Sequence, residues 1–447
     1  MTRKLADFAA GLAYEEIPEE VLSVMRDDAL DSVAVGIFGS SLTQVILATE
    51  LWEELGGAPQ ATVWGRPSKL PVPVAVRANS HAQNAFEYDD TYVWSGFGIH
   101  PGNNVVPAAV AVSEMLGGAS GRDFVTALTT GHEVAVRVRM GVTSAPCGHN
   151  YTALCSTFGA AAAAGRLLGL DSQEMQWALG AAGAYVGALL TVPPDSMVKQ
   201  LVNGRAAEGG VMGAMLARRG FTGVENILEA AQGGFYSMHS SSFDFSRVLK
   251  DLGQTFHCVH VHAKRYPIIT SAQHAVEAAC ELRARESFAP DDISKIVVRT
   301  NARSQKSTTG FAVRTLTSAQ MSLAFGVATA VLTGNILPEA VSESALKNPA
   351  LVRLMTLVEP VVDTEFGEVK QESGGPAQVI VYLKDGSVLR SPVIPDIRRM
   401  TTAEIERKAE HLISLVFSRQ RAQRLLSVFE ALPALPDIVP LFPLLAP

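Results

Sequence analysis

Acidic, aromatic and histidine side chains crowd together ahead of a small, apolar stretch between residues 85 and 112, in "AFEYDDTYVWSGFGIHPGNNVVPAAVAV". The members able to bind a ligand or move a proton are Glu87, Asp89, Asp90, Thr91 and His100. A metal site, a capped helix with a solvated loop, and a proton-transfer pocket all use such residues. Calcium and magnesium usually need more oxygen ligands than this cluster offers. Spacing alone favours capping of the following helix by Asp90 and Thr91.

Two basic segments further along the chain can bind anions or transfer protons. In "MVKQLVNGRAAEGGV", Lys199 and Arg205 are flanked by small and apolar residues, so either can reach a pocket and bind an anion. In "HAKRYPIIT", Lys264 precedes a Tyr-Pro turn at the expected domain junction, where small-molecule sites are common. A partly buried lysine has a lowered pKa and can act as a base. An ion pair that ties the domains together is the equally good alternative.

Known metal and nucleotide motifs are incomplete or absent. His132-Glu133 begins like a zinc-binding helix, but the position four residues after His132 is Val136. The segment "HCVHVHAK" offers three possible zinc ligands, His257, His260 and His262. In a strand, His257 would point away from the other two, so we expect no metal site. The sequence contains neither a phosphate-binding P-loop nor a dinucleotide-binding glycine motif after a strand in its N-terminal half.

Composition narrows the class of protein. The chain has 447 residues, 47% of them hydrophobic, and a net charge of −7, which argues against a nucleic-acid partner. No uninterrupted apolar run approaches the roughly 18 residues of a membrane span, and the first residues do not resemble a signal peptide. The four cysteines, Cys147, Cys155, Cys258 and Cys280, form no C-x-x-C pair. We therefore expect a cytoplasmic protein.

Hydrophobic periodicity predicts helices over most of the first 265 residues. Beyond Pro267 the pattern predicts a helix over about 271–287, a strand at 293–300, a helix over about 318–332, and a hairpin turning at Asp385-Gly386. Helices return from Thr401, followed by a proline-broken apolar tail. We predict a mainly α fold, in which residues 1–266 and 400–447 form a large all-helical domain. Residues 267–399 form an inserted, smaller α+β domain.

The sequence resembles the MmgE/PrpD family over nearly its whole length. Seven segments match in order, among them "AFEYDDTYVWSGFGIHPGNNVVPAAVAVSEMLG", "GHEVAVRVRMG", "MVKQLVNGRAAEGGVMGAMLARRGFTG" and "AKRYP". The resemblance implies two domains with an active site at their junction, no cofactor, and a homodimer. It also implies a small polycarboxylate as substrate. Family activities include 2-methylcitrate dehydratase, cis-aconitate decarboxylase and iminodisuccinate epimerase.

The family's site residues carry over onto several positions of this chain. Glu87, usually Asp, begins the acidic segment that continues to Thr91, and His100 matches the histidine of the His-Pro-Gly motif. Lys199 and Lys264 match the pocket and junction lysines. Three positions depart from the family pattern: Asn150 replaces a pocket histidine, Ile269 a cysteine or histidine, and Phe325 a tyrosine.

These departures remove acids that a dehydratase or decarboxylase uses, whereas an epimerase needs only two groups facing one carbon. The sequence-based prediction is therefore an epimerase of iminodisuccinate type, with a hydro-lyase or a cis-aconitate decarboxylase-like lyase as the alternative. Lys264 would be one base, and Tyr151, His149 or His100 would lie opposite it. The residues predicted to bind substrate are Lys199, Arg205, Glu87, Thr91, Asp90 and Asn150.

Overall fold

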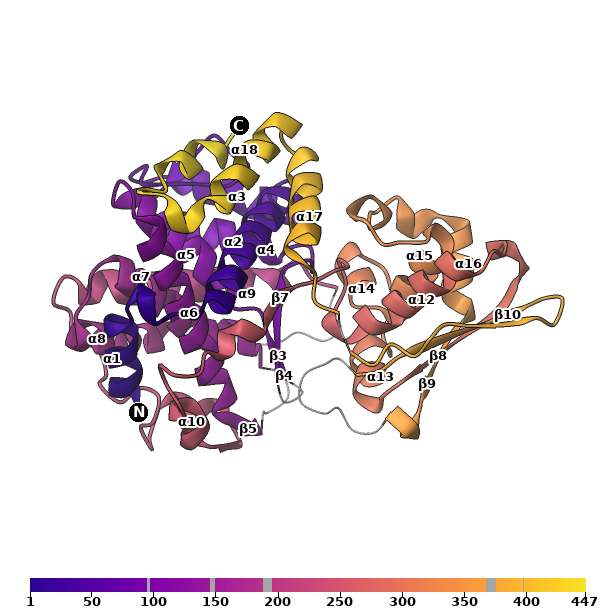
Figure 1. Cartoon of the computed structure of the whole chain (residues 1–447), viewed down its shortest axis with the longest axis horizontal. Helices are drawn as coiled ribbons and strands as arrows, with labels where there is room; N and C mark the ends of the chain where they lie inside the picture. The colour runs from indigo at the N-terminus through magenta and orange to yellow at the C-terminus, as the bar shows by residue number, and fades with distance from the viewer. Residues whose placement is uncertain (95–96, 145–148, 188–194, 367–374, 397) are drawn as a thin grey trace.

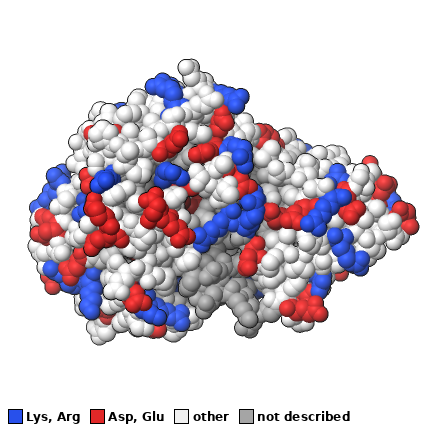
Figure 2. Space-filling model, viewed as in Figure 1, with Lys and Arg blue, Asp and Glu red and all other residues white. Residues whose placement is uncertain are grey.

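The computed structural model describes residues 1–94, 97–144, 149–187, 195–366, 375–396 and 398–447. A larger helical body and a smaller body with a four-stranded sheet lie side by side, joined by several passes of the chain (Figure 1). Basic and acidic side chains are intermixed over the face of both bodies seen in Figure 2. The predicted mainly α fold class is confirmed. Short antiparallel pairings interrupt the helices of the larger body, where an all-helical domain was expected.

The larger body is built from amphipathic and alanine-rich helices. They include α2 (Glu19–Gly39), α4 (Val72–Asn84), α5 (Gly102–Met115), α6 (Gly121–Met140), α7 (Tyr151–Leu167) and α9 (Val198–Ala217). α6 and α7 cross closely at Gly131 and Gly159. A Cβ added to Gly159 would lie only 2.6 Å from the carbonyl oxygen of Gly131, so only glycine fits at this crossing. Small side chains thus let the central helices of this body pack tightly.

The smaller body has a sheet in the strand order β11-β10-β8-β9. β8 (Ile293–Thr300) coincides with the predicted strand and pairs antiparallel with β10 (Gln378–Leu383) and parallel with β9 (Val358–Val362). β10 and β11 (Val388–Arg390) form the predicted hairpin, whose Gly386 has a φ of 92°. Helices α12 (Gln273–Arg285) and α15 (Leu323–Thr333) pack together in this body.

The C-terminal helices return to the larger body. α17 (Thr402–Ser414) packs against α2, and α18 (Arg419–Glu430) packs against both of them. The apolar tail is buried on the same body, where the carbonyl oxygen of Leu445 accepts a hydrogen bond of 2.8 Å from the Gly65 amide. The domain division at residues 266 and 400 stays a prediction.

Within the described ranges no single helix is both long and apolar enough to cross a membrane. The helices α2 and α3 (Thr43–Leu55) reach that length and apolarity only as a pair, and they are bent by 86° relative to each other.

Candidate active site

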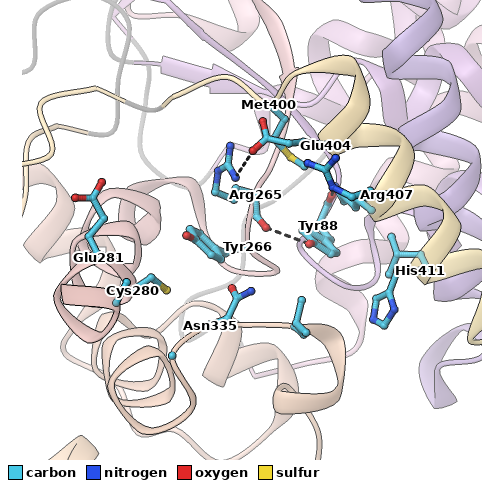
Figure 3. Close-up of a pocket in the computed structure, with 15 residues that line it drawn as sticks. Tyr88, Arg265, Tyr266, Cys280, Glu281, Asn335, Met400, Glu404, Arg407 and His411 are labelled. Atoms are coloured by element: carbon cyan, nitrogen blue, oxygen red, sulfur yellow. Dashed lines mark hydrogen bonds and ion pairs between the residues drawn. The ribbon is translucent and has the colours of Figure 1, made fainter. Parts of the chain in front are cut away.

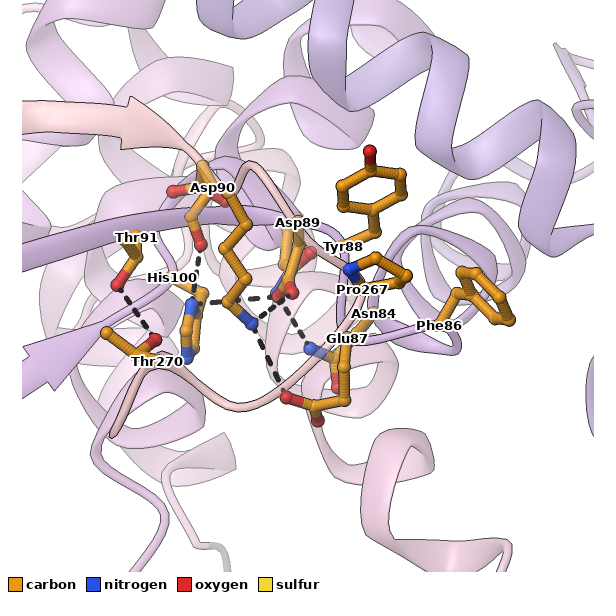
Figure 4. A network of polar contacts seen from close by, with 12 residues as sticks. Asn84, Phe86, Glu87, Tyr88, Asp89, Asp90, Thr91, His100, Pro267 and Thr270 are labelled. Carbon is orange, nitrogen blue, oxygen red and sulfur yellow. Dashed lines mark hydrogen bonds and ion pairs between the residues drawn. The ribbon is translucent and has the colours of Figure 1, made fainter. Parts of the chain in front are cut away.

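A small antiparallel sheet brings two distant polar segments together. β3 (Asp90–Trp94) pairs with β4 (Phe97–Ile99) on one side and with β7 (Val261–Ala263) on the other. In this register Asp90 lies opposite Ala263 and Thr91 opposite His262. The residues just beyond this pairing, Asp89 and Lys264, therefore meet at the end of the sheet (Figure 4).

Lys264 is the centre of a buried ionic network. Its Nζ lies 2.9 Å from Oδ1 of Asp89 and 3.4 Å from Oε2 of Glu87. Burial lowers the pKa of Lys264, but the negative charges of Asp89 and Glu87 outweigh burial and hold it above its ordinary value. The direction is opposite to that expected for a lysine base, and Lys264 is protonated at neutral pH.

Glu87 links Lys264 to the second lysine of the network. Lys199, near the start of α9, donates a hydrogen bond to Oε1 of Glu87. Burial raises the pKa of Glu87, yet the two lysines outweigh this and keep it below the ordinary value. Glu87 has a φ of 56°, in the left-handed region that few residues other than glycine adopt. Such local strain is often found at functional sites.

His100 lies beside the same carboxylates with one ring nitrogen already engaged. Its Nδ1–H donates to the backbone carbonyl of Asp90 at 2.5 Å and lies 3.7 Å from Oδ2 of Asp89. This hydrogen bond places the proton on Nδ1 and leaves Nε2 as the basic nitrogen. Burial lowers the pKa of His100 more than the nearby carboxylates raise it, so His100 is neutral at pH 7.

Asp90 performs the capping role that spacing favoured. Its Oδ2 accepts a hydrogen bond of 3.0 Å from the amide of Gly102, the first residue of α5. Burial and the charges of Asp28 and Asp89 raise the pKa of Asp90 well above its ordinary value. Thr91 caps no helix: its hydroxyl lies on β3, 3.5 Å from that of Thr270. The prediction that Thr91 caps the helix was therefore wrong.

Two amides that sequence reasoning missed hold the carboxylate of Asp89, and a third amide holds one of the two. Asn84 and Asn103 donate to its Oδ2 at 2.8 and 2.6 Å, and Asn203 donates to the side-chain oxygen of Asn84 at 2.8 Å. All three asparagines are at least 95% buried. A polar amide inside an otherwise apolar helix, as in "PGNNVVPAAVAV", was the available signal.

Lys408, a second buried lysine that sequence reasoning missed, contacts the backbone of both segments that carry the network. Lys408 of α17 forms an ion pair of 2.8 Å with Asp31 of α2. Its Nζ also donates to the backbone carbonyls of Tyr88 and Lys264, at 2.8 and 3.0 Å. One ammonium thus joins α2, α17 and the two segments that carry the network.

Arg205 and Asn150 do not join this network. Arg205 lies exposed on α9, and no hydrogen bond or ion pair is found between it and the described network residues. It is six residues after Lys199, which places it on another face of the helix. The oxygen of Asn150 accepts a hydrogen bond from the amide of Ala153 and caps α7. Arg205 thus lies apart from Lys199, and its role in holding a substrate carboxylate stays a prediction.

Tyr151 and His149 lie next to His239 instead. The hydroxyl of Tyr151 donates to the carbonyl oxygen of His239, and the rings of His149 and His239 are 5.5 Å apart. Burial raises the pKa of Tyr151 to about 12, which disfavours its action as a base at neutral pH. Among the described residues, no group of three or more histidine, cysteine or carboxylate side chains converges as metal ligands.

Two family models and several known proteins match this chain. Residues 3–248 match the MmgE/PrpD N-terminal domain and residues 266–433 match the MmgE/PrpD C-terminal domain. The cis-aconitate decarboxylase-like protein oryM of Aspergillus oryzae is 26% identical, over 95% of this chain and 93% of that protein. The cis-aconitate decarboxylases of Aspergillus terreus and Homo sapiens are each 29% identical, over 64% and 67% of this chain and 60% and 64% of their own lengths. With both of its domain models matched, the chain belongs to the MmgE/PrpD family.

Proposed function

We propose that this protein is a lyase that decarboxylates a small unsaturated polycarboxylate of the cis-aconitate type. The observation that carries the proposal is the pairing of a proton donor with a proton acceptor around Asp89. Lys264 is held protonated, and His100 is neutral with Nε2 available. The similarity to proteins named as cis-aconitate decarboxylases favours a lyase over the epimerase predicted from sequence.

In the proposed reaction, the bond between a carbon atom and its carboxylate breaks and carbon dioxide leaves. The bonding electrons move into a neighbouring conjugated carboxylate, whose growing negative charge the Lys199 and Lys264 ammonium groups stabilise. A proton is then added to carbon, so that each turnover consumes one proton. Lys264 donates this proton and regains it from solvent, while His100 accepts a hydrogen bond from a protonated group of the substrate or product.

The substrate carboxylates must compete with Glu87 for the two lysines. Glu87 contacts Lys199 and Lys264 at once, so a bound carboxylate can replace it on either lysine without leaving an ammonium unpaired. Carboxylate exchange of this kind suits a polyanionic substrate, because each buried cation remains compensated throughout binding.

An epimerase is the second candidate, favoured by the three departures from the family pattern. Asn150 caps α7, Phe325 is 1% exposed within the hydrophobic core, and Ile269 packs against the same core. None of these side chains can donate the proton that a relative would take from that position. An epimerase would use Lys264 and His100 on opposite sides of one carbon.

Proton NMR in heavy water distinguishes the two candidates. The enzyme is incubated separately with cis-aconitate, citrate, 2-methylcitrate and iminodisuccinate. The proposal expects an itaconate-type product from cis-aconitate, with one deuterium on carbon. Interconversion of iminodisuccinate diastereomers with deuterium uptake and no alkene would instead support the epimerase. An alkene formed from citrate or 2-methylcitrate would support a dehydratase.

We also propose that the protein is a homodimer, as the family resemblance implies. Sedimentation equilibrium tests this directly, and a mass of one chain at micromolar concentration would contradict it.

A further inference from the structure

A cavity of about 510 Å³ lies between α17 and the smaller body (Figure 3). None of Glu87, Asp89, His100, Lys199 and Lys264 lines it. It lies behind the network, since Tyr88 lines the cavity and its ring points away from Glu87 and Asp89 in Figure 4. Its volume is typical of small-molecule sites, which span roughly 300–1,000 Å³.

The walls of this cavity combine flat and apolar surfaces. The rings of Tyr88 and Tyr266 face it (Figure 3), and Met400, Leu337 and Leu412 also line it. They come from the segment just before β3, the chain after Lys264, the residues before and within α17, and the loop that follows α15. Such walls favour a compact or planar apolar group as the body of a ligand.

Two arginines give the cavity hydrogen-bond donors with no acceptor. Arg265 donates through Nη1 to Glu404 at 3.1 Å, but its buried Nε and Nη2 have no hydrogen-bond partner, and Nε lies 3.5 Å from Glu277. Arg407 is exposed at the edge of the cavity and forms no ion pair or hydrogen bond with a described residue. Guanidinium groups with free donors favour carboxylate ligands.

The acidic side chains of the cavity are already compensated. Glu404 accepts hydrogen bonds from Arg398 at 2.7 Å and from the Thr401 amide at 2.9 Å, in addition to Arg265. Glu281 pairs with Arg285 at 3.4 Å. The unsatisfied groups of the cavity are therefore cationic donors, so an anion fits better than a cation.

We propose that this cavity binds a small monocarboxylate carried on a compact or aromatic ring. The carboxylate lies against Arg265 and Arg407, and the ring lies between Tyr88, Tyr266 and Met400. This site is separate from the polycarboxylate site, and its occupancy does not depend on which reaction that site performs.

The backbone connects the two sites. Lys408 donates to the carbonyls of Tyr88 and Lys264, and the Tyr88 hydroxyl donates to the carbonyl of Arg265 at 3.0 Å. A ligand that packs on Tyr88 and Arg265 thus contacts the neighbours of Glu87, Asp89 and Lys264. The two sites are expected to influence each other's affinity, and this coupling is reciprocal.

Methyl NMR of the full-length protein labelled with [methyl-¹³C]methionine tests the proposal, with benzoate as the probe. The chain has 12 methionines, and the Met400 signal is assigned from its loss in Met400→Leu. Benzoate is expected to shift the Met400 methyl signal saturably because its ring lies against that side chain. Benzamide, which has nearly the same shape and no charge, is expected to cause a much smaller shift at equal concentration.

Substitutions separate the cavity from other effects. Arg407→Gln is expected to weaken benzoate binding about fivefold or more, because it removes a charged donor. Arg424→Gln, at an exposed arginine of α18 outside the cavity, is the matched control and leaves the affinity unchanged. Ala284→Trp, at an exposed lining position of α12, is expected to block the cavity and abolish the shift.

A weak site with a millimolar Kd saturates at tens of millimolar ligand. The proposal is therefore overturned if the shift of the Met400 signal does not saturate over that range of benzoate concentration. Equal shifts with benzamide and benzoate would also overturn it, because the cavity would then recognise the ring and not the carboxylate. Since the readout is binding at Met400, failure of the proposed decarboxylase activity leaves this test unaffected.

Discussion

The ammonium of Lys264 lies 2.9 Å from the carboxylate of Asp89, and both side chains are almost completely buried. Asp89 is further held by Asn84 and Asn103, so the carboxylate is fixed before any substrate arrives. Burial disfavours the charge on Asp89, but the positive charge and hydrogen bond of Lys264, together with the hydrogen bond from Asn103, outweigh burial and keep the pKa of Asp89 below its ordinary value. The pair is thus charged in the folded protein, and each partner depends on the other.

Lys264→Met is expected to destabilise the protein by about 3–5 kcal/mol at neutral pH, because it leaves the buried carboxylate of Asp89 unpaired. The double variant Lys264→Met/Asp89→Asn should lose less stability than the sum of the single variants. Urea unfolding of all four proteins completes the cycle, with Lys347→Met as an exposed control. Additive losses would mean that the two side chains are not energetically coupled.

Asp90→Asn is expected to be as stable as the parent protein or about 1 kcal/mol more stable at about pH 8, because the amide oxygen still accepts from Gly102. Burial and neighbouring carboxylates raise the pKa of Asp90 above its unfolded value. The contribution of Asp90 to the free energy of unfolding is therefore present at low pH and lost as the pH rises. The stability of Asp90→Asn relative to the parent protein should accordingly increase with pH. Asp90→Ala removes the cap and should cost about 1 kcal/mol. Equal destabilisation by Asn and Ala in urea unfolding would argue that an ionised carboxylate is needed.

The elements of this fold were predictable because their signals are local. The β8 strand and the hairpin at Asp385-Gly386 follow from alternation and turn residues over a few positions. The helix expected over about 318–332 is broken because Ser322 caps α15, accepting a hydrogen bond from the amide of Phe325. A serine inside an apolar run does not reveal in advance that it will begin a new helix.

The site itself was only partly predictable. Glu87, His100, Lys199 and Lys264 were identified as site residues, but through family resemblance and not from spacing. Asp89 and Lys264 are 175 residues apart, and the β3–β7 register that joins them has no local signature. The support from Lys408 requires α17 to fold back onto α2, which periodicity cannot indicate.

Stability is expected to fall as the pH drops below about 6.5, because buried histidines resist protonation. Burial lowers the pKa of His81 and His274 to about 4, and both ring nitrogens of His274 lack hydrogen-bond partners. The unfolded chain takes up these protons first, so stability is present at neutral pH and lost between about pH 6.5 and 4. His274→Leu should reduce the stability lost between about pH 7.5 and 5 by about 2 kcal/mol. Urea unfolding at the two pH values measures this, and an unchanged loss would show that His274 gains its proton without cost.

Lys199→Gln and Arg205→Gln form a matched pair on α9 that tests which cation holds substrate. Lys199 contacts Glu87 beside Lys264, whereas Arg205 lies exposed without a described partner in the network. Lys199→Gln is expected to lower kcat/KM for the NMR-identified substrate by about 100-fold, because it removes a charge that stabilises the developing carboxylate charge. Arg205→Gln should change kcat/KM less than about threefold, as surface substitutions usually do. A large loss in Arg205→Gln with a small loss in Lys199→Gln would place the substrate on the other face of α9. Similar unfolding midpoints of the two variants would exclude misfolding as the cause of either result.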